Sequence, residues 1–180
     1  AGGQAVANYG SVTNPEEARA MVQACSDSFG KIDILIANAG ILRDKSFKNM
    51  DDTMWDVVLD VHLRGTYLTT KAAYDTMIEQ GNGGRIIMTS STSGLLGNFG
   101  QTNYGAAKAG IAGFMRCLWL EGMKYGITVN VLAPTATSRM TTSTKTCLRG
   151  MSSCSTTFRR RRKSSRRRRR AWCWPTSICR

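Results

Sequence analysis

The sequence lacks several features that would assign it to a broad protein class. Its apolar runs are all far shorter than the ~20 residues of a membrane helix, so we expect no membrane span. Its six cysteines form no Cys-x-x-Cys pair, so we expect no zinc or other metal site. Only Cys25 and Cys117 precede residue 141, which favours a reduced, intracellular protein. Ala1–Gln4 shows no signal sequence, which is typical of a chain that begins mid-sequence.

Acidic residues are absent from the last part of the chain. All 12 Asp and Glu residues lie in residues 1–140 together with 12 basic residues, so this part is neutral. The formal net charge of +13 therefore resides entirely in residues 141–180. Such a charge on a whole chain would suggest a partner such as nucleic acid or an acidic membrane. Its distribution instead divides the chain into a neutral domain, 1–140, and a basic tail, 141–180.

Helices and strands alternate in the neutral part. Asn14 and Pro15 predict a helix start, and Gly30 predicts its end. Further helices are expected over 52–80 and 104–125. Mostly apolar runs, typical of strands covered on both faces, occupy 32–37, 85–89 and 127–133, and 5–9 is a short extended candidate.

This alternation predicts an α/β fold, a Rossmann-like doubly wound parallel sheet. In such sheets ligands bind beyond the carboxyl ends of the strands. The segments 38–46, 90–103 and 134–140 follow strand ends, so we expect their side chains to converge on one site.

Tyr104 and Lys108 are four residues apart on one expected helix, which places them on the same face. A phenol has a pKa of about 10, and a nearby ammonium group lowers that pKa and favours the phenolate. Ser91 follows a strand end and can hold a carbonyl or alcohol oxygen. Helices contain a Tyr-x-x-x-Lys spacing by chance, and such a pair is ordinarily an aromatic residue and an exposed lysine without a role. Here three other features favour proton-transfer chemistry instead: Ser91, Asn38-Ala39-Gly40 and Asn130–Pro134.

With these motifs, residues 1–140 resemble the short-chain dehydrogenase/reductase family. The family's Asn-Ala-Gly motif stands as Asn38-Ala39-Gly40, and its Ser/Tyr/Lys set as Ser91, Tyr104 and Lys108. Three longer segments resemble more narrowly the (3R)-hydroxyacyl-CoA dehydrogenases of peroxisomal fatty-acid β-oxidation. They are Asn38–Asp44, Val61–Gly65 and Gly97–Tyr104.

The resemblance implies a role for each matched residue. Tyr104 would exchange a proton with the substrate oxygen, Lys108 would lower the tyrosine pKa and bind the nicotinamide ribose, and Ser91 would orient the substrate. Asn38, Ala39 and Gly40 would form the cofactor-side wall. His62 stands where the family commonly has Asn, and two interpretations stay open: a buried core residue, or a part of the proton relay.

The resemblance also implies a nicotinamide cofactor, NAD, with NADP not excluded. Ser11 and Val12 would lie near the adenine, and the loop at Pro134 near the nicotinamide, although Thr135 replaces the family's usual Gly. A Gly-rich pyrophosphate-binding turn does not precede Asn38, and likeness to the family ends near Thr141. We therefore expect a dehydrogenase domain truncated at its N-terminal βαβ unit and at its C-terminal end, whose own activity stays open.

The implied partners are a small acyl-CoA or another carbonyl or alcohol substrate, and a second copy of the chain paired through the long helices. No membrane partner is expected. The resemblance implies a peroxisomal location, but the chain stops at Ile178-Cys179-Arg180 without a peroxisomal targeting ending. Otherwise a cytoplasmic location is expected.

The basic tail admits three interpretations. Its Arg runs and Trp172 and Trp174 could bind nucleic acid, which gives an alternative function: a nucleic-acid-binding protein on a degenerate dehydrogenase core. It could be a solvated low-complexity segment. We favour the third interpretation, an out-of-frame translation, because acids vanish and the family likeness ends abruptly.

Overall fold

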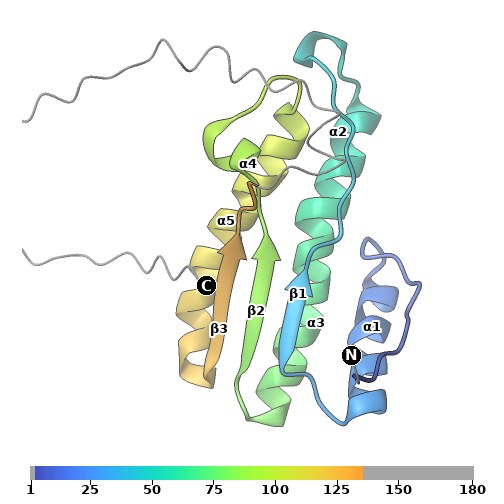
Figure 1. The fold of residues 1–180 in the computed structure, drawn as a ribbon, viewed down its shortest axis with the longest axis vertical. Coiled ribbons are helices and arrows are strands. Elements are labelled where there is room, and N and C mark those ends of the chain that lie inside the picture. Colours follow the sequence, from blue (N-terminus) through green and yellow to red (C-terminus); the bar gives the residue numbers. More distant parts are fainter. Residues whose placement is uncertain (1–2, 136–180) are drawn as a thin grey trace, which may run out of the picture. The chain divides into compact units, whose positions relative to one another are not determined.

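The computed structural model describes residues 3–135. Three strands and several helices alternate along the chain, as expected (Figure 1). The α-helices are α1 (Pro15–Phe29), α2 (Asp52–Leu59), α3 (Gly65–Gln80), α4 (Thr92–Leu96) and α5 (Thr102–Gly122). The strands are β1 (Ile34–Ala37), β2 (Gly84–Thr89) and β3 (Ile127–Leu132). Short 3-10 turns occupy Phe47–Asn49 and Met123–Tyr125, and a π-helical turn occupies Asp60–Arg64. The predictions for residues 136–180, the basic tail included, lie outside the described residues.

The strands form one parallel sheet in the order β1-β2-β3, which confirms the α/β fold class. Ile36 of β1 is aligned with Ile87 of β2, which is aligned in turn with Asn130 of β3. All three strands therefore end at the same edge of the sheet (Figure 1). This arrangement brings together the segments after Ala37, Thr89 and Leu132, as the sequence predicts.

Local signals explain why α1 forms where it does. The Asn14 side chain accepts hydrogen bonds from the backbone N–H groups of Glu16 and Glu17, which have no partner within the helix. Pro15 occupies the first helical position, where a missing N–H costs nothing. Gly30 ends the helix with φ of 79°, a left-handed conformation that glycine adopts without strain.

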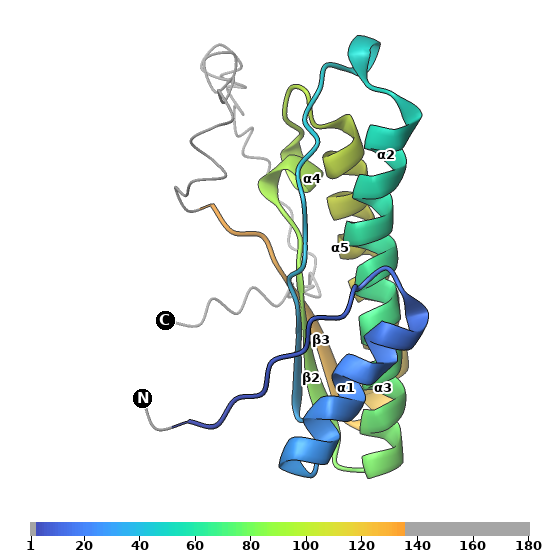
Figure 2. The same ribbon diagram turned by 90° about the vertical axis from the view of Figure 1, so that its right-hand side faces the viewer.

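The core lies between the sheet and the helices on one of its faces. In Figure 2, α3 and α5 stand on one side of the three strands. Fully buried apolar side chains from both layers fill the space between them: Ala73, Met77, Ile86, Met88, Ile111, Ile127 and Val129. Helix α1 packs against α3 beside the β1 edge. Burial of these side chains supplies the main driving force for folding.

Two expectations need correction. The apolar strands are not covered on both faces within residues 3–135, because the packed helices lie on one side; Ile34, Ile36 and Leu132 are 58%, 63% and 56% exposed on the other. Residues 5–9 join no strand of the sheet. The long helix expected over 52–80 is present as one continuous helical run, and it contains the π-helical turn Asp60–Arg64. No helix among the described residues has the length and apolar character needed to cross a bilayer.

Two glycines of α5 give a matched stability test. A Cβ at Gly122 would lie 2.6 Å from the Ile127 carbonyl oxygen, whereas a Cβ at Gly113 would meet no atom within 4 Å. We expect Gly122→Ala to lower the free energy of unfolding by about 1–3 kcal/mol through overpacking. Gly113→Ala should raise it by about 0.5–1 kcal/mol, because alanine favours the helix. Urea unfolding of both variants measures the difference; equal effects would contradict the packing of α5 against β3.

Candidate active site

Tyr104 and Lys108 lie one turn apart near the start of α5, beside the end of β2. Lys108 is 3% exposed, and its Nζ donates a hydrogen bond to the Thr89 carbonyl oxygen at 2.6 Å. The same Nζ lies 5.6 Å from the centre of the Tyr104 ring. Ser90 binds the helix from β2, since its hydroxyl donates to the Lys108 carbonyl oxygen at 2.7 Å. The end of β2 therefore fixes the depth and direction of the lysine side chain.

Burial lowers the pKa of Lys108 to about 8. No carboxylate within residues 3–135 forms an ion pair with this ammonium group. A buried cation without an anionic partner is costly, and a ligand with oxygen acceptors would reduce that cost. Lys108 is therefore suited to hold the hydroxyl groups of a bound sugar.

The surroundings of Tyr104 change the pKa of its hydroxyl group. Burial raises the pKa of Tyr104, hydrogen bonding by the Ser91 side chain lowers it, and the negative charge of Asp44 raises it. The net direction is upward, whereas the sequence predicted that Lys108 would lower this pKa. The reason is that burial outweighs the other effects and the Lys108 Nζ is directed to the Thr89 carbonyl oxygen.

His62 lies in the π-helical turn and packs edge-on against the Tyr104 ring, with ring centres 5.1 Å apart. Its Nε2 lies 2.7 Å from the Ile41 carbonyl oxygen and 3.1 Å from the Ile41 amide nitrogen. The Nδ1 atom is buried and has no hydrogen-bond partner within the described residues. Burial is the largest effect and lowers the His62 pKa, so the imidazole is neutral at pH 7. One nitrogen thus supports the chain after β1, and the other is available for a proton or a water molecule.

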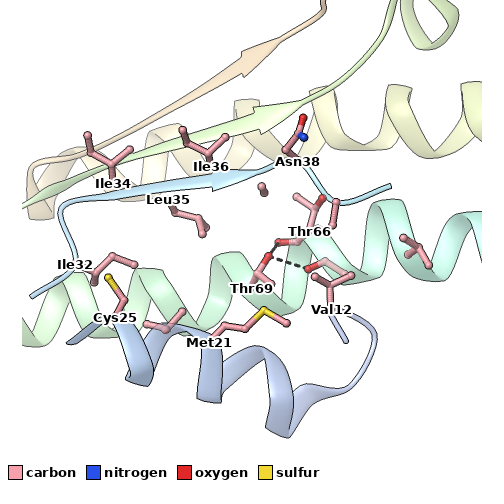
Figure 3. Close-up of a pocket in the computed structure, with 15 residues that line it drawn as sticks. Val12, Met21, Cys25, Ile32, Ile34, Leu35, Ile36, Asn38, Thr66 and Thr69 are labelled. Atoms are coloured by element: carbon pink, nitrogen blue, oxygen red, sulfur yellow. Dashed lines mark hydrogen bonds between the residues drawn. The ribbon is translucent and has the colours of Figure 1, made fainter. Parts of the chain in front are cut away.

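The Asn38-Ala39-Gly40 segment follows β1 and borders the same site. The Thr89 hydroxyl donates to the Asn38 side-chain oxygen at 3.0 Å, which connects the ends of β1 and β2. A Cβ at Gly40 would collide with the His62 imidazole, so only glycine lets the ring pack there. Asn38 and Ala39 also line the end of an apolar cavity of about 270 Å³ between α1, β1 and α3 (Figure 3).

The remaining predicted residues have other surroundings. Val12 lines that cavity too, beside the start of α3 (Figure 3). Ser11 is bound to the start of α1, because its amide donates to a Glu17 carboxylate oxygen at 2.6 Å. Pro134 is exposed after β3. The contacts described above thus connect Ser91, Tyr104, Lys108, His62 and Asn38, whereas Ser11 and Val12 belong to the segment before α1 and Pro134 follows the end of β3.

Two polar residues at the start of α5, Gln101 and Asn103, received no role from the sequence, nor did Asp44, whose carboxylate accepts from the Gln101 side chain at 2.8 Å. Asn103 is 0% exposed, and its Nδ2 donates to the carbonyl oxygens of Arg43 and Met54 at 3.1 and 3.0 Å. Its Oδ1 accepts from the Tyr104 amide at 2.7 Å. Gln101 and Asn103 stand close to Tyr104 in the sequence, which was the available signal, but the bonds to Asp44, Arg43 and Met54 span 49 to 60 residues. Within residues 3–135 no group of three His, Cys, Asp or Glu side chains could hold a metal ion.

Comparison with known proteins identifies the family. The model for short chain dehydrogenases matches residues 1–149. The chain belongs to the short-chain dehydrogenase/reductase family. This dehydrogenase is 54% identical over 140 residues to the peroxisomal hydratase-dehydrogenase-epimerase of Neurospora crassa, covering 78% of the chain and 15% of that relative. It is also 54% identical to peroxisomal multifunctional enzyme type 2 of Mus musculus, covering 78% of the chain and 18% of that relative.

A solved structure agrees with the fold of this short-chain dehydrogenase. A short chain dehydrogenase from Mycobacterium avium superposes with a TM-score of 0.73 at 41% identity, covering 77% of the chain and 49% of that structure. The chain thus spans about half the length of this neighbour and less than one fifth of the two peroxisomal relatives. Family membership confirms the predicted resemblance and implies a nicotinamide cofactor, NAD or NADP.

The buried lysine predicts a pH-dependent stability. The pKa of Lys108 is 10.5 in an ordinary setting and about 8 in the fold, so between these values the unfolded chain binds more protons. Stability should therefore rise with pH over this window, by roughly 3 kcal/mol in total. Lys108→Met lacks this titrating group. The free energy of unfolding of the wild-type chain should therefore rise relative to that of the variant between pH 8 and 10.5. Denaturant unfolding at several pH values measures this gain, and parallel pH profiles would contradict it.

Proposed function

We propose that the chain is an oxidoreductase that interconverts a secondary alcohol and a ketone, with a 3-hydroxyacyl-CoA as substrate and NAD as cofactor. The observation that carries the proposal is the convergence of Ser91, Tyr104 and the buried Lys108 at the ends of β1 and β2. The acyl-CoA substrate rests on the resemblance of the three segments named in the sequence analysis, and the peroxisomal names of two relatives at 54% identity support a peroxisomal location. NADP stays an alternative to NAD.

Each residue has a part in the proton transfer. During alcohol oxidation the Tyr104 oxygen, as phenolate, takes the proton of the substrate hydroxyl; during ketone reduction it returns that proton. The hydride would be accepted or supplied by a nicotinamide cofactor held beside Lys108 and Asn38. The Ser91 hydroxyl donates a hydrogen bond to the substrate oxygen and keeps it near Tyr104. A positively charged Lys108, with its Nζ 5.6 Å from the ring centre, would favour the phenolate and so oppose the rise that burial causes in the Tyr104 pKa.

The described residues fit part of the cofactor. Lys108 can donate to ribose hydroxyls, and Asn38 borders the same edge of the sheet. One ring nitrogen of His62 bonds to the backbone of Ile41, which directly follows the Asn38-Ala39-Gly40 segment. Within residues 3–135 no Gly-rich turn joins a strand to a helix, so the groups that would hold the pyrophosphate are not assigned to this part of the chain.

We further propose that two copies associate through α2, α3 and α5. Leu59, Leu63, Tyr67 and Phe114 line a shallow hollow between these helices. Tyr67 and Trp119 are 49% and 41% exposed, and exposed aromatic residues are typical of protein interfaces. Sedimentation analysis that shows a monomer at all concentrations would contradict this association.

The decisive variant is Tyr104→Phe, which removes the hydroxyl and keeps the ring. Loss of the proton donor and acceptor should reduce turnover by roughly 100-fold or more. NADH formation is followed with a (3R)-hydroxyacyl-CoA, in the full chain and in a chain extended by the preceding segment of the mouse relative. Tyr125→Phe, at the distant end of the fold, is the control and should retain turnover. Unchanged turnover in Tyr104→Phe would refute the role of Tyr104.

A further inference from the structure

The segment 10–13, which precedes α1 and is here called the α1 loop, is attached to that helix by short polar contacts. The Ser11 amide donates to the Glu17 carboxylate at 2.6 Å, and Glu17 belongs to the first turn of α1. The hydroxyl groups of Ser11 and Thr13 lie 2.8 Å apart, and the Ser11 hydroxyl accepts from the Thr13 amide at 3.3 Å. These contacts define the shape of the loop, but they do not fix its position against α3 or the sheet.

Arg64, in the π-helical turn, bonds to the α1 loop from the other side. Its Nη1 donates to the Thr13 carbonyl oxygen at 2.8 Å, across 51 positions of the sequence. The same nitrogen lies 3.1 Å from the Asp60 carboxylate, one helical turn earlier. Both side chains are about half exposed, so this ion pair adds little stability by itself. Its effect is to direct the guanidinium group toward Thr13.

The residue after Arg64 sets how closely the α1 loop approaches α3. A Cβ at Gly65 would lie 2.8 Å from Val12 Cγ2 and 3.4 Å from the Val12 carbonyl oxygen. Glycine is therefore required for the loop to pack this near the start of the helix. Two consecutive residues thus hold the loop, because Arg64 bonds to its backbone and Gly65 makes room for its side chain.

Val12 faces the same cavity as the segment that follows β1. The cavity of about 270 Å³ is lined by Val12 together with Asn38 and Ala39, and Val12 and Asn38 both lie toward the carboxyl end of β1 (Figure 3). Nucleotides bind beyond this end of the strands in open parallel sheets. Lys108, which is suited to hold sugar hydroxyl groups, lies at the end of the neighbouring strand β2. Val12 therefore stands on the β1 side of the site, where the half of a dinucleotide that does not contact Lys108 can lie.

We propose that Arg64 is a positioning residue for the cofactor: it holds the α1 loop so that Val12 forms an apolar wall for the adenine ring. The family resemblance implies that Val12 lies near the adenine, and the structure adds the group that keeps this residue in place. A wall that is fixed before the nucleotide arrives avoids the entropic cost of ordering the loop on binding. The nucleotide part rests on the proposed function, but the attachment of the loop by Arg64 does not.

Hydrogen–deuterium exchange of the full chain tests the attachment without any nucleotide. Arg64→Met should raise the exchange rates of the amides of residues 10–14 by roughly fivefold or more, because the loop loses its bond to the π-helical turn. Arg64→Lys should keep the slow rates, since one ammonium group can donate to both Thr13 and Asp60 in place of Nη1. Arg116→Met, at an exposed position of α5, is the matched control and should leave the rates unchanged.

Unchanged exchange in Arg64→Met would overturn the proposal, and so would exchange in Arg64→Lys as fast as in Arg64→Met. If Arg64→Met does not fold, Arg64→Gln takes its place, because its side chain is polar but shorter.

Nucleotide binding is tested by NMR titration with the two halves of the cofactor, AMP and nicotinamide mononucleotide. Arg64→Met should raise the Kd of AMP roughly threefold or more and leave that of nicotinamide mononucleotide unchanged. Equal weakening of both would overturn the positioning role, since a general loss of structure produces that result. An unchanged Kd of AMP would overturn it as well. If the wild-type chain binds neither half, the nucleotide part fails together with the proposed function, and the exchange rates still decide the attachment of the loop.

Discussion

The site depends on Lys108, which is buried without a counter-charge from any residue between 3 and 135. An ammonium group loses its hydration when it is enclosed, and Lys108 recovers one hydrogen bond, which its Nζ donates to the Thr89 carbonyl oxygen. That bond requires the end of β2 to lie directly against the first turns of α5. Ser90 strengthens the same junction from the opposite direction, through the Lys108 carbonyl oxygen. The place of Tyr104, one turn earlier on the helix, follows from this junction, so strand, helix and reactive side chains form one unit.

Features set by neighbouring residues were the easiest to predict from the sequence. Asn14, Pro15 and Gly30 define α1 by local capping and backbone preferences, and the structure has the helix at those bounds. The apolar runs at β1, β2 and β3 likewise identify these strands from the local sequence. The convergence of Asn38, Ser91 and Tyr104 followed from a general property of parallel sheets, namely that their strands end at one edge.

Features that depend on distant contacts were not predictable in this way. The Asp44–Gln101 bond joins residues 57 positions apart, and nothing in either neighbourhood indicates the other. The upward shift of the Tyr104 pKa depends on how deeply the ring is enclosed, which a four-residue spacing does not report. The exposed face of the sheet was missed for a related reason. An apolar strand sequence shows that both faces can be covered, but it does not show which segments cover them.

The π-helical turn has a consequence for how the chain can vary. A turn with i to i+5 hydrogen bonds holds one residue more than an α-helical turn, which rotates everything after it by roughly 100° about the axis. Before the turn α2 packs against α5, and after it α3 packs against α1 and the sheet. The extra residue is what lets one continuous helical rod present apolar surface in two directions. Loss of a single residue here would turn the buried side of α3, with Ala73 and Met77, away from the strands. The spacing between Asp60 and Arg64 is therefore as much a part of the fold as the side chains themselves.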